Sequence, residues 1–270
     1  MLGEPEVDYT LVMPVFNEEA RIAPTLKGFT EVWTRVLARA GKTYELIAVL
    51  NGCTDRSPEI IRRHAGDSAS GCIRVLSIPS PNKGKAVLAG LSEARGAVVG
   101  FADSDGAILP HEMLAIMRTA ETGVVCIGSK RHPRTRCSAR QPLPRRIASV
   151  GWNILVRLVL GLRLSDTQAG AKAMPAGCAR RIVHLTSPCR YAFDVSLLWE
   201  AKRAGYEICE QPLTWQHVAG SKFKLWQEAP RMLIALLRVR AGFADRLSDE
   251  GIQEMTPPRR ETNSAVTESH

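Results

Sequence analysis

The sequence predicts an α/β fold in which a mostly parallel central sheet carries helices on both faces. Three observations lead to this fold class. Short apolar runs rich in β-branched residues alternate with amphipathic stretches through the first hundred residues, turn residues separate them, and polar side chains follow the predicted strands. With 270 residues, 45% of them hydrophobic, the chain is long enough to bury a large core.

The predicted elements of the first hundred residues alternate strictly. The first helix has apolar residues at helical spacing and ends at Gly41, and the second begins with Ser57 as its N-cap and Pro58 at its first position. The predicted strands and helices, in chain order, are strand 9–16, helix 18–41, strand 45–51, helix 57–66, strand 72–79, helix 85–96 and strand 97–103.

After residue 122 the strict alternation of predicted strands and helices ends. The expected order is strand 124–130, a Pro- and Arg-rich loop 131–146, an apolar helix 147–164, a helix 193–205, a strand 206–215 and an amphipathic segment 224–247. We expect a single domain over residues 1–247, followed by a disordered tail over residues 248–270.

Bulk composition excludes several classes of protein. No run of about 18 uninterrupted apolar residues and no basic-then-apolar leader is seen, so neither a membrane span nor secretion is indicated. The seven cysteines are scattered without a CxxC pair, which disfavours a zinc cage or a disulfide framework. The expected compartment is the cytoplasm.

Positive charge gathers in one stretch of the chain. The net charge is +9, and between Thr122 and Ser165 there are nine Lys and Arg residues and no Asp or Glu. Such a block indicates phosphate binding, although a solvated loop is an alternative interpretation. Nucleic acid is not the expected partner, because Trp152 is the one aromatic residue in this stretch and base stacking needs interleaved aromatic side chains.

Polar residues at the carboxyl ends of the predicted strands indicate a ligand site. In parallel sheets ligands collect at this edge. A GxGxxG and a GxxxxGK[ST] sequence are both absent, so a dinucleotide dehydrogenase and a P-loop ATPase fit poorly.

Asp103 and Asp105 are the main candidates for metal ligands at that edge. Residues i and i+2 of an ending strand point the same way, so the two carboxylates can share one hard cation such as Mg²⁺ or Mn²⁺. Magnesium usually keeps waters and takes substrate phosphate oxygens, which favours a nucleoside diphosphate as ligand. The alternative is an ordinary surface turn, in which Asp is common.

The ordered motifs resemble family 2 glycosyltransferases of the GT-A fold, specifically the branch that glucosylates or mannosylates dolichyl-type polyprenyl phosphate. The resemblance covers roughly residues 8–240. It rests on VMPVFNEEARI, VLNGCTDRS, NKGKAVLAGLSEARG, FADSDGA, GSKR at 128–131, DTQAGAKAM at 166–174, FDVSLLWEAKRAGYEICEQPLTW at 193–215 and HVAGSKFK at 217–224. It implies a Rossmann-like nucleotide-sugar half near residues 8–121 and an acceptor half near residues 122–247.

For the donor, the resemblance implies a nucleoside diphosphate sugar of the UDP-glucose or GDP-mannose type, with Mg²⁺ or Mn²⁺ held by Asp103 and Asp105. The implied donor-binding residues are Pro14, Asn17, Glu18, Asn51, Lys85, Asp103, Ser104 and Asp105. One motif departs from the family pattern, because Leu50-Asn51-Gly52-Cys53 replaces Asp-Asp-Gly-Ser. This departure leaves the identity of the nucleotide open.

For the acceptor, a phosphate monoester is already ionised near neutral pH and can attack without a general base. Cationic side chains are needed to bind this phosphate, and a pocket for the transferred hexose must form beside them. The residues expected to bind the acceptor or shape that pocket are Lys130, Arg131, Arg145, Arg146, Asp166, Gln168, Lys172 and Lys222. Asp194 falls near the position of the base in other family 2 enzymes and is the third catalytic candidate, beside Asp103 and Asp105.

The expected activity is therefore an inverting, metal-dependent transfer of a hexose to polyprenyl phosphate. Two apolar stretches, 150–164 and 225–247, are expected either to lie on a membrane surface or to pack in the core, and the first outcome would make the protein peripheral on the inner face of the membrane. The alternative function is transfer to a hydroxyl of a small molecule, glycan or protein, with Asp194 as the base.

Overall fold

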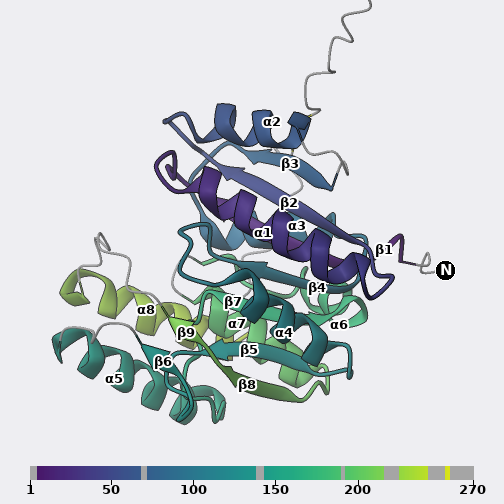
Figure 1. The fold of residues 1–270 in the computed structure, drawn as a ribbon. Helices are drawn as coiled ribbons and strands as arrows, with labels where there is room; N and C mark the ends of the chain where they lie inside the picture. Colours follow the sequence, from purple (N-terminus) through teal and green to yellow (C-terminus); the bar gives the residue numbers. More distant parts are fainter. Residues whose placement is uncertain are drawn as a thin grey trace, which may run out of the picture.

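The computed structural model describes residues 5–67, 72–137, 143–189, 192–215, 225–242 and 253–255 (Figure 1). An eight-stranded sheet has the order β10-β3-β2-β1-β4-β7-β5-β8, and β6 and β9 form a separate pair. The strands are β1 (Val7–Val15), β2 (Tyr44–Asn51), β3 (Ile73–Ile78), β4 (Gly96–Ala102), β5 (Val125–Ser129), β6 (Arg136–Cys137), β7 (Ala171–Pro175), β8 (Ile208–Pro212), β9 (Thr214–Trp215) and β10 (Gln253–Met255). The helices are α1 (Ile22–Ala38), α2 (Ser57–Asp67), α3 (Lys83–Ser92), α4 (Pro110–Ala120), α5 (Leu143–Leu160), α6 (Ala176–Ile182), α7 (Phe193–Arg203) and α8 (Leu225–Arg240).

The first four strands confirm the predicted parallel arrangement. β1 lies between β2 and β4 and is parallel to both, and β3 is parallel to β2. All four carboxyl ends therefore meet at one edge of the sheet. From Leu46 to Leu50 every residue of β2 is buried, as expected for a strand covered on both faces.

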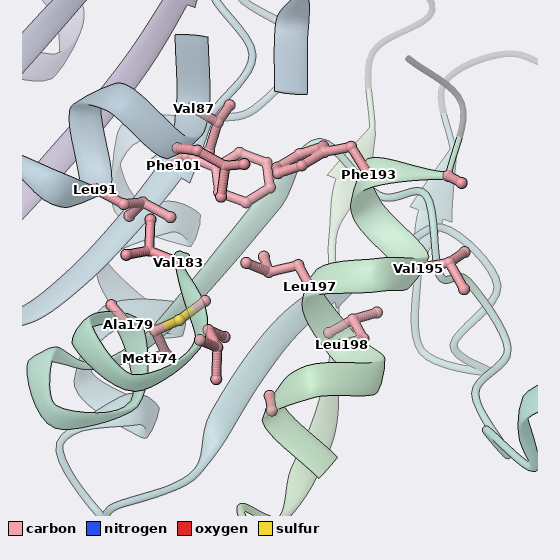
Figure 2. Close-up of a cluster of buried hydrophobic side chains, with 14 of the residues drawn as sticks. Val87, Leu91, Phe101, Met174, Ala179, Val183, Phe193, Val195, Leu197 and Leu198 are labelled. Atoms are coloured by element: carbon pink, nitrogen blue, oxygen red, sulfur yellow. The ribbon is translucent and has the colours of Figure 1, made fainter. Parts of the chain in front are cut away.

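Helices cover both faces of the sheet, which also confirms the prediction. Residues of α1, α2 and α4 pack on one face, where Trp33 and Met113 join side chains of β1 such as Leu11. On the other face α3, α6 and α7 pack against β1, β2 and β4, and α5 and α8 extend this layer at one end of the molecule (Figure 1). Figure 2 shows part of this second core, in which Phe101 of β4 and Phe193 of α7 lie 5.7 Å apart between ring centroids.

β7, α4 and α6 are additional to the predicted elements. The strand AKAMP contains no β-branched or aromatic residue, so local propensity does not indicate a strand there. Its strand conformation comes from tertiary pairing, because β7 lies antiparallel between β4 and β5. This placement puts Lys172 in the middle of the sheet.

Some element boundaries differ from the predicted ones. α1 begins at Ile22 rather than near residue 18, because the preceding residues form a turn bonded to the loop after β2. The predicted loop 131–146 contains β6 and the first turn of α5. Within the predicted tail, Gln253–Met255 form β10, which pairs antiparallel with β3.

Candidate active site

The carboxyl ends of β1, β2 and β4 bring together three loops that the sequence singled out. The loop after β1 is held in a tight turn at Asn17, whose φ is 54°. Asn17 Oδ1 accepts a hydrogen bond from Thr54 N at 2.8 Å, and Asn17 Nδ2 donates to Thr54 Oγ1 at 3.1 Å. Asn tolerates this left-handed conformation better than most residues, so its presence here is explained locally.

The same turn is fixed through its backbone. Glu18 N donates to Ser57 Oγ at 2.8 Å, and Glu19 N donates to Asp55 Oδ2 at 3.0 Å. The turn after β1 and the loop after β2 therefore form one unit. Pro14, also a predicted donor contact, is buried in β1 beneath this turn.

Glu18 faces the aspartate pair across the edge of the sheet. Its carboxylate bonds Arg21, with an Arg21 Nη2 to Glu18 Oε2 distance of 2.7 Å. Burial nevertheless raises the pKa of Glu18, Arg21 opposes this, and the negative charges of Asp105 and Asp103 raise it further. Three acidic side chains thus share one electrostatic environment, and bringing in a cation would relieve their repulsion.

Asp103 and Asp105 lie just beyond the end of β4, as predicted. Asp103 N donates to Gly170 O at 2.9 Å, and Asp105 Oδ1 accepts from Ala107 N at 3.0 Å. A Cβ atom on Gly170 would lie 2.1 Å from Asp103 Oδ2, so glycine is required for this loop to approach the carboxylate. The intervening Ser104 is buried, and its hydroxyl donates to Pro14 O at 2.9 Å, which ties β4 to β1.

Asn51 and Asn82 order the start of α3. Asn51 is buried at the end of β2 and accepts a hydrogen bond from Asn82 N at 2.6 Å. Asn82 in turn is the N-cap of α3, and its side chain accepts from Lys85 N at 3.1 Å. Lys85 is partly exposed in the first turn of that helix.

Lys83, which the sequence analysis did not select, forms an ion pair with Asp103. Its ammonium lies 2.5 Å from Asp103 Oδ1. Burial lowers the pKa of Lys83, but the charges of Asp103, Asp194 and Asp105 together raise it above its ordinary value. The signal available in the sequence was its position at a helix start shortly after a strand end, in the same NKGK motif as Lys85.

Lys172 and Asp194 form a buried ion pair beside this group. Lys172 is fully buried, and its ammonium lies 2.6 Å from Asp194 Oδ1 and 2.7 Å from Ala169 O. The ammonium is also 5.2 Å from the centroid of the Phe101 ring. Asp194 is in the first turn of α7, where a negative charge is favoured by the helix dipole.

The segment 165–168 is held by two residues that the sequence analysis missed. Glu210 of β8 accepts hydrogen bonds from Ser165 N at 2.9 Å and Asp166 N at 3.1 Å. Asn153 of α5 donates to Ser165 O at 2.8 Å and accepts from Thr167 Oγ1 at 3.0 Å. Their roles depend on tertiary contacts, so no local motif identifies them.

The predicted acceptor residues are brought together only in part. Asp166 is buried and accepts from Lys130 N at 3.0 Å, so the loop after β5 meets the segment 165–168, in which Gln168 is exposed. Arg131 follows directly, and its N donates to Ser129 Oγ at 3.3 Å. Arg145 and Arg146 belong to the first turn of α5, with side chains outside the described part, and Lys222 lies outside the described residues altogether.

The carboxylates of Asp103 and Asp105 at the sheet edge suit a divalent ion whose remaining ligands come from water and substrate. Within the described residues no group of three or more His, Cys, Asp or Glu converges as a metal cage. Two carboxylates with open positions match the preference of Mg²⁺ for few protein ligands, waters and phosphate oxygens. The Asp103 carboxylate is already paired with one positive charge, the Lys83 ammonium.

The amino-acid sequence of this chain is similar to those of known glycosyltransferases. The family described as "Glycosyl transferase family 2" matches residues 10–179. A dolichyl-phosphate beta-glucosyltransferase of Trichomonas vaginalis is 31% identical over 80% of this chain and 68% of its own length. A dolichyl-phosphate beta-glucosyltransferase of Drosophila melanogaster is 28% identical over 86% of this chain and 75% of its own.

Among solved structures, glucosyl-3-phosphoglycerate synthase from Mycobacterium tuberculosis, in complex with Mn²⁺, UDP and phosphoglyceric acid, is similar in fold. Its TM-score is 0.62 at 20% identity, and the match covers 94% of this chain and 88% of that one. The predicted GT-A fold is thereby confirmed.

Proposed function

This chain belongs to glycosyl transferase family 2, and on that basis we propose that it transfers a hexose, with inversion, from a nucleoside diphosphate sugar to a polyprenyl phosphate. The observation that carries the proposal is the aspartate pair at the carboxyl end of β4, within reach of cations from α3. The choice of acceptor is supported by the relatives named above, which align over four fifths or more of the chain.

The donor would lie across the carboxyl ends of β1, β2 and β4. Asn17, Glu18 and Asn51 would contact the base and ribose, and Lys85, in the first turn of α3, would contact the diphosphate. Leu50 or Asn51 stands where the family has the acid, and the side-chain oxygen of Asn51 already accepts a hydrogen bond from Asn82 N.

Asp103 and Asp105 would hold Mg²⁺ or Mn²⁺. A divalent ion supplies Lewis-acid neutralisation of the leaving diphosphate. The chain's contribution is to fix both carboxylates: Gly170 O holds the backbone of Asp103, Ala107 N bonds the carboxylate of Asp105, and Ser104 anchors the strand end to Pro14.

The acceptor phosphate would approach from the side of Lys130, Arg131 and the segment 165–168. Arginine offers bidentate geometry to phosphate, so Arg131, Arg145 and Arg146 are suited to aligning it for in-line attack at the anomeric carbon. Asp166, Gln168 and Lys222 complete the proposed acceptor set. Lys172 is fully buried and acts on this set through the backbone at Ala169 and through Asp194.

A substrate screen tests the proposal. UDP- and GDP-hexoses are each incubated with short polyprenyl phosphates, and labelled sugar extracted into organic solvent is counted. We expect lipid-phase product with one donor class, and we expect EDTA to remove at least about 95% of it, because the diphosphate then leaves without a Lewis acid. Full activity after chelation would contradict the metal dependence.

The same screen, extended to water-soluble acceptors that carry a hydroxyl group, decides between acceptor types. If label passes only to water-soluble acceptors, and Asp194→Asn abolishes that transfer, the enzyme uses a hydroxyl acceptor with Asp194 as base. The polyprenyl phosphate assignment would then be wrong.

The polyprenyl chain of the proposed acceptor is apolar and would lie in a membrane, so the enzyme must reach a membrane surface. Helices α5 and α8 have the features needed to bind one. None of the helices in the described ranges is long and apolar enough to cross a bilayer. The two helices contact each other, and both keep apolar side chains exposed, with exposed arginines Arg157 and Arg238 beside them. The exposed apolar residues are Val150, Ile154 and Leu158 on α5 and Leu233, Ile234 and Leu237 on α8. We propose that this α5/α8 surface docks on an anionic lipid membrane.

Leu158→Glu is expected to lower the partition coefficient onto vesicles containing phosphatidylglycerol about tenfold. The leucine is 78% exposed, and burying such a side chain in the interface is worth about 1.5–3 kcal/mol. Leu185→Glu, at a 51% exposed leucine just after α6, is the matched control. Co-sedimentation measures both, and equal loss in the two variants would contradict docking through α5.

A further inference from the structure

Lys83 has a fixed backbone and an adaptable side chain. On one side of it, Asn82 N bonds the buried Asn51 at 2.6 Å. On the other, a Cβ at Gly84 would lie 2.6 Å from Pro188 O, so α3 begins in close contact with the segment leading to α7. The lysine side chain, by contrast, is about one third exposed and has a flexible four-carbon stem.

The ammonium of Lys83 occupies a position that matters for the cation site. It lies 2.5 Å from Asp103 Oδ1, and Asp105 and Asp194 lie close enough for their charges to act on it. Beyond Asp194 comes the ammonium of Lys172, at 2.6 Å. Opposite charges therefore alternate in the order Asp103, Lys83, Asp194, Lys172.

A divalent ion on the same carboxylate would disturb this arrangement. Oxygen ligands lie about 2.1 Å from Mg²⁺, so an ion on Asp103 Oδ1 and the ammonium would be within about 5 Å of each other, and their charges would repel. The Lys83 side chain can relieve this repulsion by turning away from Asp103. A diphosphate bound to the ion would offer it new oxygen acceptors nearby.

We propose that Lys83 holds the cation position at Asp103 while no divalent ion is bound, and moves to the diphosphate of the nucleotide when the ion and the nucleotide bind together. This assignment rests on the proposed function, because it assumes the metal and the nucleoside diphosphate sugar. Lys83 then couples the two binding events: it weakens ion binding to the free protein and strengthens nucleotide binding to the ion-loaded protein.

Direct binding measurements test this assignment without any turnover. Mn²⁺ is titrated into wild type and Lys83→Met, with free Mn²⁺ followed by electron paramagnetic resonance, and UDP or GDP is then titrated calorimetrically at saturating Mn²⁺. In Lys83→Met we expect the Kd for Mn²⁺ alone to fall about fivefold or more, and the Kd for the nucleotide to rise about tenfold, as removal of one close charge implies. Lys83→Arg should restore both values toward those of wild type.

Two further variants serve as controls: one removes a positive charge outside the candidate site, and the other removes the proposed Mn²⁺ ligand. Lys27→Met removes one positive charge from α1, where Lys27 pairs with Glu31 at 3.7 Å, and should change neither Kd by more than about twofold, as for an exposed pair. Asp103→Asn should bind Mn²⁺ weakly whichever residue stands at 83. Thermal melting establishes that each variant is folded.

The outcomes separate this inference from the proposed function. If Lys83→Met binds Mn²⁺ no more tightly than wild type, or binds the nucleotide equally well, the inference is overturned while metal-dependent transfer stands. If wild type binds no Mn²⁺ even with UDP or GDP present, the inference and the metal dependence are both wrong.

Discussion

Asp105→Asn protein is expected to transfer hexose at least about a thousandfold more slowly than wild type, because it lacks a proposed ligand of the divalent ion, and such an ion contributes several kcal/mol to stabilising the charge of the leaving group. The fold should not change. The amide oxygen of Asn can still accept the hydrogen bond from Ala107 N, which is 3.0 Å from Asp105 Oδ1. Initial rates with saturating donor and acceptor measure the effect.

Asp8→Asn is the matched control for this variant. Asp8 also accepts a backbone hydrogen bond, from Thr43 N at 2.8 Å, but it lies at the opposite edge of the sheet, near the start of β1. It should retain the wild-type rate. Turnover at the wild-type level in Asp105→Asn would refute the role of the aspartate pair.

Lys172→Met is expected to lower the free energy of unfolding by about 3–5 kcal/mol, the usual cost of removing one partner of a buried ion pair. Lys172 is fully buried, and the side chain of Asp194 is 12% exposed, so the unpaired carboxylate would have little access to water. The contact of the ammonium with the Phe101 ring would be lost as well. Urea unfolding followed by circular dichroism measures the change.

A second variant separates lost charge pairing from lost packing. In Lys172→Met/Asp194→Asn the unpaired charge is gone, and part of the lost stability should return. Lys202→Met, on the same helix as Asp194 but with its ammonium bonded to Gly161 O near the surface, should cost no more than about 1 kcal/mol. Wild-type stability in Lys172→Met would show that the buried pair contributes nothing.

Local patterns were enough to predict much of the structure of residues 8–121. Strands β1 to β4 are apolar runs bounded by turn residues, and they appear within one or two residues of their predicted limits. The position of Asp103 and Asp105 at the sheet edge could be predicted because they directly follow an apolar strand, and their binding of a metal stays a prediction. Asn17 was indicated by the family resemblance, and the structure explains its residue type by the left-handed turn that it forms.

The second half was less predictable, for a different physical reason. Without β-branched residues β7 gives no local strand signal, and it becomes a strand only by pairing with β4 and β5. The roles of Glu210 and Asn153 arise because these residues, 45 and 12 positions from Ser165 in the chain, come to lie beside it. No local pattern marks Lys83 as an ion-pair partner of Asp103, which is 20 positions further along the chain but 2.5 Å away in space.

By itself the sequence determined the strands and helices of the first hundred residues and the position of the carboxylate pair, because each is encoded by residues close together in the chain, and the order of its motifs indicated the class of chemistry. Only the tertiary structure decided which cation meets Asp103, that Lys172 is buried against Asp194, and how the segment 165–168 is held. Those facts depend on contacts between residues 12 to 45 positions apart, and ion pairing and burial are set by such contacts rather than by local residue order.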